Sequence, residues 1–312
     1  MGGPLPRFTG RSMGGSHPFC TLDEQIERLS SRGMAVDDER SAKAFLISHN
    51  YYRVVNGYKD FFLDPEKSND SKDVFRRGSS FEQLMTLFSF DSELRSRCLF
   101  ALEVAESRMK TATVYAFCDR YPETLSYLSP ESYCQRSQYY RPDRHQENLD
   151  SLLEVLRRAS LQNCHNKPYV QHYLDGPSGE VPLWVLAGCL TFGNMAHFFD
   201  LCTPSCRNGA CKLIGEVVGR RLDPKRMSFI YKVLKDYRNI CAHGDRLFCA
   251  RTGPRRDRGF DELISRIRPV LTEGEFASLV AEPISDALSM LDAFPDIEAN
   301  IMIEMGLDGA VL

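Results

Sequence analysis

A short run near the carboxyl end of a predicted helix gathers groups that can act on a phosphodiester. Within residues 238–243 the polar groups belong to Arg238, Asn239 and His243, and Arg246 follows three residues later. A guanidinium binds phosphate through two parallel hydrogen bonds and stabilises charge that grows on its oxygens. An imidazole, with a pKa of about 6.5, exchanges protons at neutral pH. Together these groups could bind and cleave a phosphodiester, and with RNA the reaction would need no metal or other cofactor, although the spacing alone proves little.

Each polar group has an expected role in that reaction. Neutral His243 takes the proton of the 2′-hydroxyl, and Arg238 binds the phosphate that the hydroxyl attacks. Asn239 orients the histidine or donates to the phosphate. A second copy of His243 protonates the leaving 5′-oxygen, so the products carry a 2′,3′-cyclic phosphate and a 5′-hydroxyl.

Helical geometry bears on whether one chain can complete such a site. Residues advance about 100° each, so Asn239 and His243 share a face, whereas Arg238 is turned about 140° from His243 toward an apolar stripe. Two copies in a dimer would bring the arginines and histidines together. On spacing alone a different arrangement is commoner: His243 suits the dipole of a helix end, and Arg238 pairs with a core carboxylate such as Glu106.

The elements that must position this run are helices. Residues 81–120 contain almost no helix breaker, and apolar side chains recur there at three- and four-residue steps. Glu106 lies beside this stripe and needs a partner, which Lys110 can supply one turn later. Further helices are expected over residues 21–33, 37–49, 144–163, 183–201, 209–221 and 224–243. Three or four short helices follow from residue 260, with turns expected at Pro269, Gly274, Pro283 and Pro295. Convincing strands are absent from the pattern, so the predicted fold class is all-α.

The amino-acid composition limits the class of protein to which this chain can belong. The chain has 312 residues, 43% of them hydrophobic and 26% charged, with a formal net charge of −3. These values are typical of a globular protein with one large or two smaller domains. No apolar run approaches the roughly 20 residues that cross a bilayer, and residues 1–18 resemble a disordered leader rather than a signal peptide. We therefore expect a cytoplasmic protein without a membrane segment.

Cysteines and common motifs suggest no metal or nucleotide-loop chemistry. The eleven cysteines are odd in number and scattered, which indicates reduced thiols. Cys202, Cys206 and Cys211 come closest to a cluster, but their spacing is not that of a zinc site. The sequence has no Gly-rich phosphate loop, no G-x-S-x-G elbow and no H-E-x-x-H pair.

Because the net charge is close to neutral, local basic patches must carry any contact with RNA. The densest patch, which we call the basic loop, contains Arg251, Arg255, Arg256 and Arg258. A second patch contains Arg220, Arg221, Lys225 and Arg226. Solvated loop charges explain each patch equally well, but their position on either side of residues 238–243 favours an approach path for RNA.

Several short motifs occur in an order that resembles a known family. They cover residues 21–26, 32–34, 50–53, 57–58, 90–91, 94–95, 101–106, 182–184, 190–193, 238–243 and 246–247. On these motifs the chain resembles an Abi-family protein of the AbiD/AbiF type from bacterial phage-defence systems. The resemblance runs over about residues 19–250.

That resemblance implies an α-helical bundle of the HEPN superfamily, whose R-x4-6-H motif forms a metal-independent ribonuclease at a dimer interface. Arg238, Asn239 and His243 match the motif, Glu106 matches a recurrent glutamate of the long helix, and Lys110 and Arg246 support the site. The implied domains are a leader over residues 1–18, a HEPN-like domain over 19–250 and a helical extension over 251–312. The implied partners are RNA, including a small structured non-coding RNA, a second copy of the chain, and an antitoxin or regulator.

Five residues depart from the family pattern. Gly188 replaces a usual Glu, Gly244 a second His, Lys110 an Arg that would donate bidentately, and Phe248-Cys249 a Trp-Asn pair. The motif itself is retained, so the leading interpretation is an endoribonuclease that serves abortive infection and is restrained until a phage infects. The alternative is a non-catalytic RNA-binding or scaffold protein that associates with a small structured RNA or a partner protein.

Overall fold

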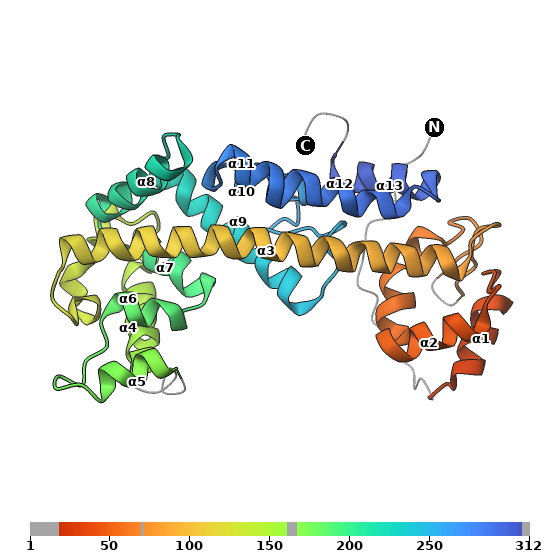
Figure 1. Cartoon of the computed structure of the whole chain (residues 1–312), viewed down its shortest axis with the longest axis horizontal. Coiled ribbons are helices and arrows are strands. Elements are labelled where there is room, and N and C mark those ends of the chain that lie inside the picture. The colour runs from red at the N-terminus through yellow and green to blue at the C-terminus, as the bar shows by residue number, and fades with distance from the viewer. Residues whose placement is uncertain (1–18, 70–71, 161–166, 308–312) are drawn as a thin grey trace. The chain divides into compact units, whose positions relative to one another are not determined.

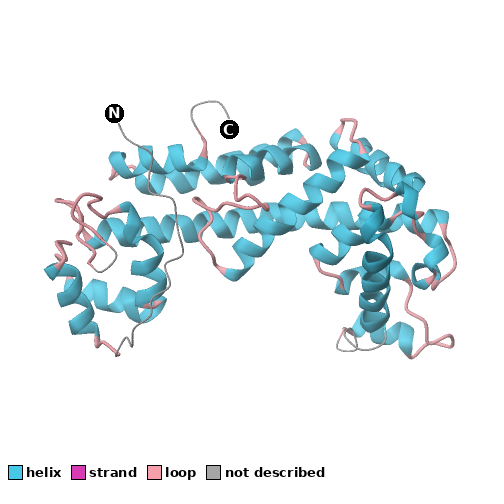
Figure 2. Cartoon of the chain, turned by 180° about the vertical axis from the view of Figure 1, so that it is seen from behind, coloured by secondary structure: helices cyan, strands magenta, loops and turns pink. Residues whose placement is uncertain are grey.

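The computed structural model describes residues 19–69, 72–160 and 167–307, so the predicted leader over residues 1–18 lies outside the described residues. Over the described ranges the chain is built from helices and isolated β-bridges, without a named strand (Figures 1 and 2). The predicted all-α class is confirmed. The chain divides into two compact units, residues 1–88 and residues 89–312.

The first unit begins with two capped helices, α1 (Leu22–Ser31) and α2 (Glu39–His49). Thr21 forms the predicted capping box: its hydroxyl accepts the N–H of Glu24, whose carboxylate accepts the N–H of Thr21. A π-helical turn over Tyr52–Asn56 and a 3₁₀ turn over Lys59–Phe61 follow. Helix α3 (Phe81–Arg120) then begins and ends where the sequence predicts.

Within the second unit, α3 buries the apolar stripe that the sequence predicts. Leu94, Leu102, Ala105 and Met109 are fully buried or nearly so. The opposite face is exposed at four-residue steps, through residues 103, 107, 111, 115 and 119. One helix therefore supplies both core and surface, as a 3.6-residue period allows.

The remaining helices of the second unit before the motif are short. They are α4 (His145–Arg158), α5 (Pro168–Leu174), α6 (Leu183–Leu186), α7 (Phe192–Leu201) and α8 (Pro204–Val218). Helix α9 (Pro224–His243) packs against α7, α8 and α10. Its buried Tyr231 donates to the carbonyl of Met109 at 2.9 Å and lies 2.9 Å from the hydroxyl of Thr113, which fixes α9 on α3.

The single helix predicted over residues 183–201 is wrong. Helix α6 ends at Leu186, a 3₁₀ turn covers Ala187–Cys189, and α7 begins at Phe192. Two interactions explain the break. The carbonyl of Leu190 accepts a hydrogen bond from Lys110 of α3 at 2.6 Å, and Thr191 caps α7 in a reciprocal box with Asn194. The helical spacing of the apolar residues continues through residues 183–201, although the backbone changes direction between α6 and α7.

The C-terminal segment contains α10 (Phe260–Ile267), α11 (Glu273–Phe276), α12 (Glu282–Leu288) and α13 (Pro295–Met305). The turns predicted at Gly274 and Pro283 are wrong, because both residues lie inside helices. Pro283 comes directly after a π-helical turn over Ala277–Ala281, which joins α11 to α12 and interrupts the regular α-helical hydrogen bonds at that point. Across the described part of the chain, no helix combines the length and the hydropathy needed to cross a bilayer.

Candidate functional site

Helix α9 remains regular through the predicted motif. It ends at Gly244, whose left-handed backbone (φ 72°) stops the helix, and the N–H of Asp245 closes the end on the carbonyl of Ile240 at 3.1 Å. Because no turn is distorted, Arg238 and His243 keep their separation of about 140° around the helix axis. Within one chain the two side chains diverge.

A buried ion pair of α3 holds the chain that follows the motif. Asp91 is fully buried, and its Oδ1 accepts the N–H groups of Leu247 and Phe248 at 3.0 and 3.1 Å. Its Oδ2 pairs with Arg95, which also donates to the carbonyl of Asp245 at 3.4 Å. Burial of a charge is tolerated because these groups satisfy the carboxylate on several sides. This Asp91–Arg95 clamp fixes the end of α9 against α3.

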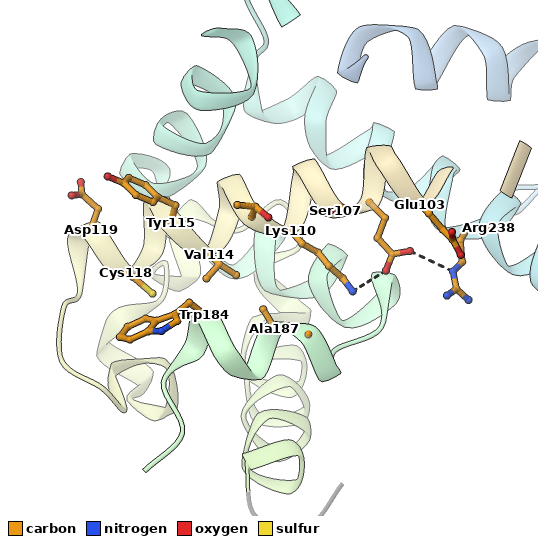
Figure 3. Close-up of a pocket in the computed structure, with 13 residues that line it drawn as sticks. Glu103, Ser107, Lys110, Val114, Tyr115, Cys118, Asp119, Trp184, Ala187 and Arg238 are labelled. Carbon is orange, nitrogen blue, oxygen red and sulfur yellow. Dashed lines mark ion pairs between the residues drawn. The ribbon is translucent and has the colours of Figure 1, made fainter. Parts of the chain in front are cut away.

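Arg238 lies against the long helix through Glu106 (Figure 3). Its Nε lies 3.4 Å from one oxygen of Glu106, and the Nζ of Lys110 lies 2.8 Å from the other. The Glu106 side chain is 11% exposed, so two cations balance a carboxylate that is largely out of water. The pairing of Arg238 with a core carboxylate, which helix spacing alone favours, is therefore present.

The guanidinium of Arg238 is only partly engaged by this contact. Its buried Nε has no hydrogen-bond partner of acceptable geometry, so the contact with Glu106 is electrostatic. The two terminal nitrogens point away from the carboxylate (Figure 3), and none of the described residues accepts a hydrogen bond from them. With 36% of its side chain exposed, Arg238 can present both nitrogens to a phosphate.

A cavity of about 820 Å³ opens beside Arg238, and we call it the α3–α6 groove. The exposed face of α3 forms one wall, and α6 with the turn after it forms the other (Figure 3). Its lining includes Ser107, Thr111, Tyr115, Cys118, Trp184 and Gly188. Arg238 and Glu103 stand at one end, and Trp184 and Cys118 at the other (Figure 3). Glu106 and Lys110 join Arg238 through their ion pairs.

Sequence reasoning missed this groove. Its two aromatic side chains are unusually accessible, since Tyr115 is 61% and Trp184 56% exposed. Ser107, Thr111 and Tyr115 recur at four-residue steps, which indicates a solvent-facing stripe along the helix. Nothing in the sequence pattern places Trp184 beside that stripe. Burial raises the pKa of the Cys118 thiol to about 11, so this thiol is protonated at neutral pH.

The structure leaves no room for a side chain at Gly188. A Cβ there would lie 2.9 Å from the hydroxyl of Tyr169, so any larger residue requires that ring to move. The Tyr169 ring therefore occupies the space that a side chain at position 188 would need.

Asn239 and His243 stand apart from the groove. Both are exposed on α9, and neither is among the residues that line the cavity. Arg246, which follows the helix, is half-buried. The structure therefore brings Arg238, Glu106 and Lys110 together, but does not bring Arg238 and His243 into one cavity of one chain.

Two of the four arginines in the basic loop contact other parts of the fold. Arg251 pairs with Glu304 at 2.7 Å, and the guanidinium of Arg258 lies 4.7 Å from the ring centre of Phe229. Arg255 and Arg256 are exposed at the tip of the loop. Of the four arginines predicted to contact RNA, Arg251, Arg255 and Arg256 are exposed and Arg258 is half-buried.

Comparison with known proteins identifies the class to which this all-α chain belongs. The sequence model described as Abi-like protein matches residues 44–249, about two thirds of the chain. That range contains α3, the α3–α6 groove, the Asp91–Arg95 clamp and the whole of α9. The chain therefore belongs to the Abi-like protein family, which associates it with abortive infection. Searches of curated proteins and of solved structures found no match.

Proposed function

We propose that this Abi-like protein is a metal-independent endoribonuclease of the HEPN superfamily, of the AbiD/AbiF type, that acts as an abortive-infection effector. One observation carries the proposal. The regular α9 helix holds a partly exposed Arg238 guanidinium at the end of a groove, and it exposes Asn239 directly after it and His243 five residues later. These are the groups that phosphodiester cleavage by a 2′-hydroxyl requires.

The chemistry is a transesterification. Neutral His243 removes the 2′-hydroxyl proton, the 2′-oxygen forms a bond to phosphorus, and the bond to the 5′-oxygen breaks. The terminal nitrogens of Arg238 stabilise the charge on the phosphate oxygens. A protonated His243 of a second copy gives its proton to the 5′-oxygen, so the products are a 2′,3′-cyclic phosphate and a 5′-hydroxyl.

The need for a second copy follows from the geometry of α9. An undistorted helix keeps Arg238 and His243 about 140° apart, too far around the axis for both to meet one phosphate. A two-fold dimer presents the same surface twice, so the Arg238 of one copy can face the His243 of the other. The complete active site is then a property of the dimer.

The test is cleavage of mixed cellular RNA in EDTA by the wild type and by the variants Arg238→Ala and His243→Ala. Arg144→Ala and His172→Ala, which remove an exposed arginine and an exposed histidine elsewhere, are matched controls. We expect the wild type and both controls to release cyclic-phosphate ends, and both motif variants to lose activity by at least about 100-fold. Equal cleavage by all five proteins rejects the assigned site.

A second candidate is an RNA-binding scaffold without cleavage. It is favoured by the ion pair between Arg238 and Glu106, which gives the arginine a structural role in the absence of any catalysis. In that case RNA binds and no cyclic-phosphate ends appear with any of the five proteins, including in the presence of a bound small structured RNA.

A further inference from the structure

We propose that the α3–α6 groove binds a short stretch of single-stranded RNA, with an unstacked base on Trp184 and a phosphate on Arg238. The inference rests on the proposed function, because the bound strand is the one that is cleaved. It adds a binding subsite and the feature of the substrate that this subsite recognises, a single strand with bases free to leave the stack.

The aromatic end of the groove provides the contact for the base. More than half of the side-chain surface of both Trp184 and Tyr115 is exposed, although large aromatic side chains are usually mostly buried. In single-stranded RNA the bases splay out and stack on such rings, and every base has a face that can do so. Tyr115 belongs to α3 and Trp184 to α6, and both side chains line the cavity, so either ring can meet a planar ligand that enters it.

The opposite end provides the contact for the phosphate. Glu106 holds the Arg238 guanidinium at its Nε and leaves the two terminal nitrogens turned away (Figure 3). This arrangement orients the arginine without filling the donors that bind phosphate in a bidentate manner. Lys110 donates to the carbonyl of Leu190 and pairs with Glu106, whereas neither terminal nitrogen of Arg238 is engaged by a described residue, so Arg238 offers more donors to a phosphate than Lys110 does.

The length of the groove matches more than one nucleotide. Glu106 and Cys118 lie twelve residues apart on α3, which corresponds to about 18 Å along the helix axis. A stacked strand advances about 3.4 Å per nucleotide and an extended one more, so roughly three to five nucleotides span that distance. The exposed hydroxyl groups of Ser107 and Thr111 lie between the two ends and can bond to phosphates or to 2′-hydroxyls.

The charge of the lining predicts how the strand is held. Glu103 and Asp119 are exposed carboxylates, so the groove does not attract a strand through many phosphates. Asp119, at the aromatic end, can accept from base amino groups. Binding should therefore depend on stacking and show a shallow salt dependence, with a slope near −0.7 for one phosphate contact.

Trp184 is the only tryptophan of the chain, so its fluorescence reports on this groove alone. The experiment uses the full-length His243→Ala variant, because this variant should not cleave the RNA during the measurement. It is titrated with an RNA hexamer of mixed sequence. Labelled hexamer and anisotropy then give the affinity for the same protein with Trp184→Ala or Trp184→Phe added. Tyr173→Ala, an exposed aromatic of α5, is the matched control. Circular dichroism verifies folding, which the exposed Trp184 should not affect.

We expect a saturable change in Trp184 fluorescence, and a loss of affinity of roughly 5- to 150-fold for Trp184→Ala but little for Trp184→Phe or Tyr173→Ala. An unchanged fluorescence, or full affinity in Trp184→Ala, overturns the inference. So does a response to a lysine- and arginine-rich hexapeptide in place of RNA, since the aromatic and acidic groups would then serve a cationic peptide. Cleavage by the wild type without a Trp184 response rejects only the groove, whereas a response without cleavage rejects only the nuclease.

Discussion

Replacement of Asp91 by alanine should destabilise the second unit strongly. The change removes the acceptor of two backbone N–H groups, those of Leu247 and Phe248, and leaves the buried Arg95 without its carboxylate. Breaking a buried pair by removal of one partner costs about 3–5 kcal/mol, because the remaining charge stays out of water. The lost N–H bonds belong to the same network and do not add independently. We therefore expect a loss of about 3–5 kcal/mol in the free energy of unfolding.

Urea unfolding monitored by Trp184 fluorescence measures this loss, because the single tryptophan lies in the same unit as Asp91. Asp119→Ala, an exposed aspartate on the same helix, is the matched control and should change stability by less than about 0.5 kcal/mol. Adding Arg95→Met to Asp91→Ala should recover part of the loss, since the buried charge of Arg95 is then removed as well. A change below about 1 kcal/mol for Asp91→Ala would refute the view that this clamp holds the end of α9.

Three further predictions concern pH, the helix end and RNA contacts. Arg108 lowers the pKa of Glu275 to about 2, below the usual value of 4.5. The pair therefore stabilises the fold above about pH 5 and loses that contribution as the pH falls toward 2. Glu275→Gln should lower the free energy of unfolding by about 1–2 kcal/mol at pH 7, where partial exposure weakens the pair, and by little at pH 2. Gly244→Ala places a Cβ in a left-handed conformation (φ 72°) and should cost about 1 kcal/mol in the same urea assay, whereas a stabilised variant would contradict the role of Gly244 as the stop of α9. For a single-stranded RNA longer than the three to five nucleotides that the groove holds, Arg255→Ala combined with Arg256→Ala should reduce the slope of log affinity against log salt concentration by about 1.4, and an unchanged slope would show that the basic loop does not touch the strand.

The main elements of the fold could be predicted from sequence because their signals are local. The long α3 helix has no breaker from residue 81 to residue 120, and Thr21 with Glu24 forms a cap that two residues define. The break between α6 and α7 could not be predicted in the same way. It depends on a hydrogen bond from Lys110 to Leu190, eighty residues away, and the apolar period of the segment continues across it.

The candidate site was predictable only in part, for a similar reason. The pair of Glu106 with Lys110 follows from their spacing of four residues, and the divergence of Arg238 from His243 follows from five helical steps. The α3–α6 groove depends on α6 packing beside α3, which no local pattern encodes. The roles of Asp91 and Arg95 in holding the segment after His243 likewise require contacts over about 150 residues.

The most direct test of the central claim is a mixing experiment. Arg238→Ala retains His243, and His243→Ala retains Arg238, so a mixed dimer contains one intact group of each kind. If the active site combines Arg238 of one copy with His243 of the other, a 1:1 mixture of the two inactive variants should cleave RNA faster than either variant alone. The rate should stay well below half of the wild-type rate, because only half of the dimers are mixed when subunits pair at random and each mixed dimer lacks the second His243 that protonates the 5′-oxygen. A mixture that stays as inactive as either variant alone, beside a wild type that cleaves, would contradict a site built from two copies.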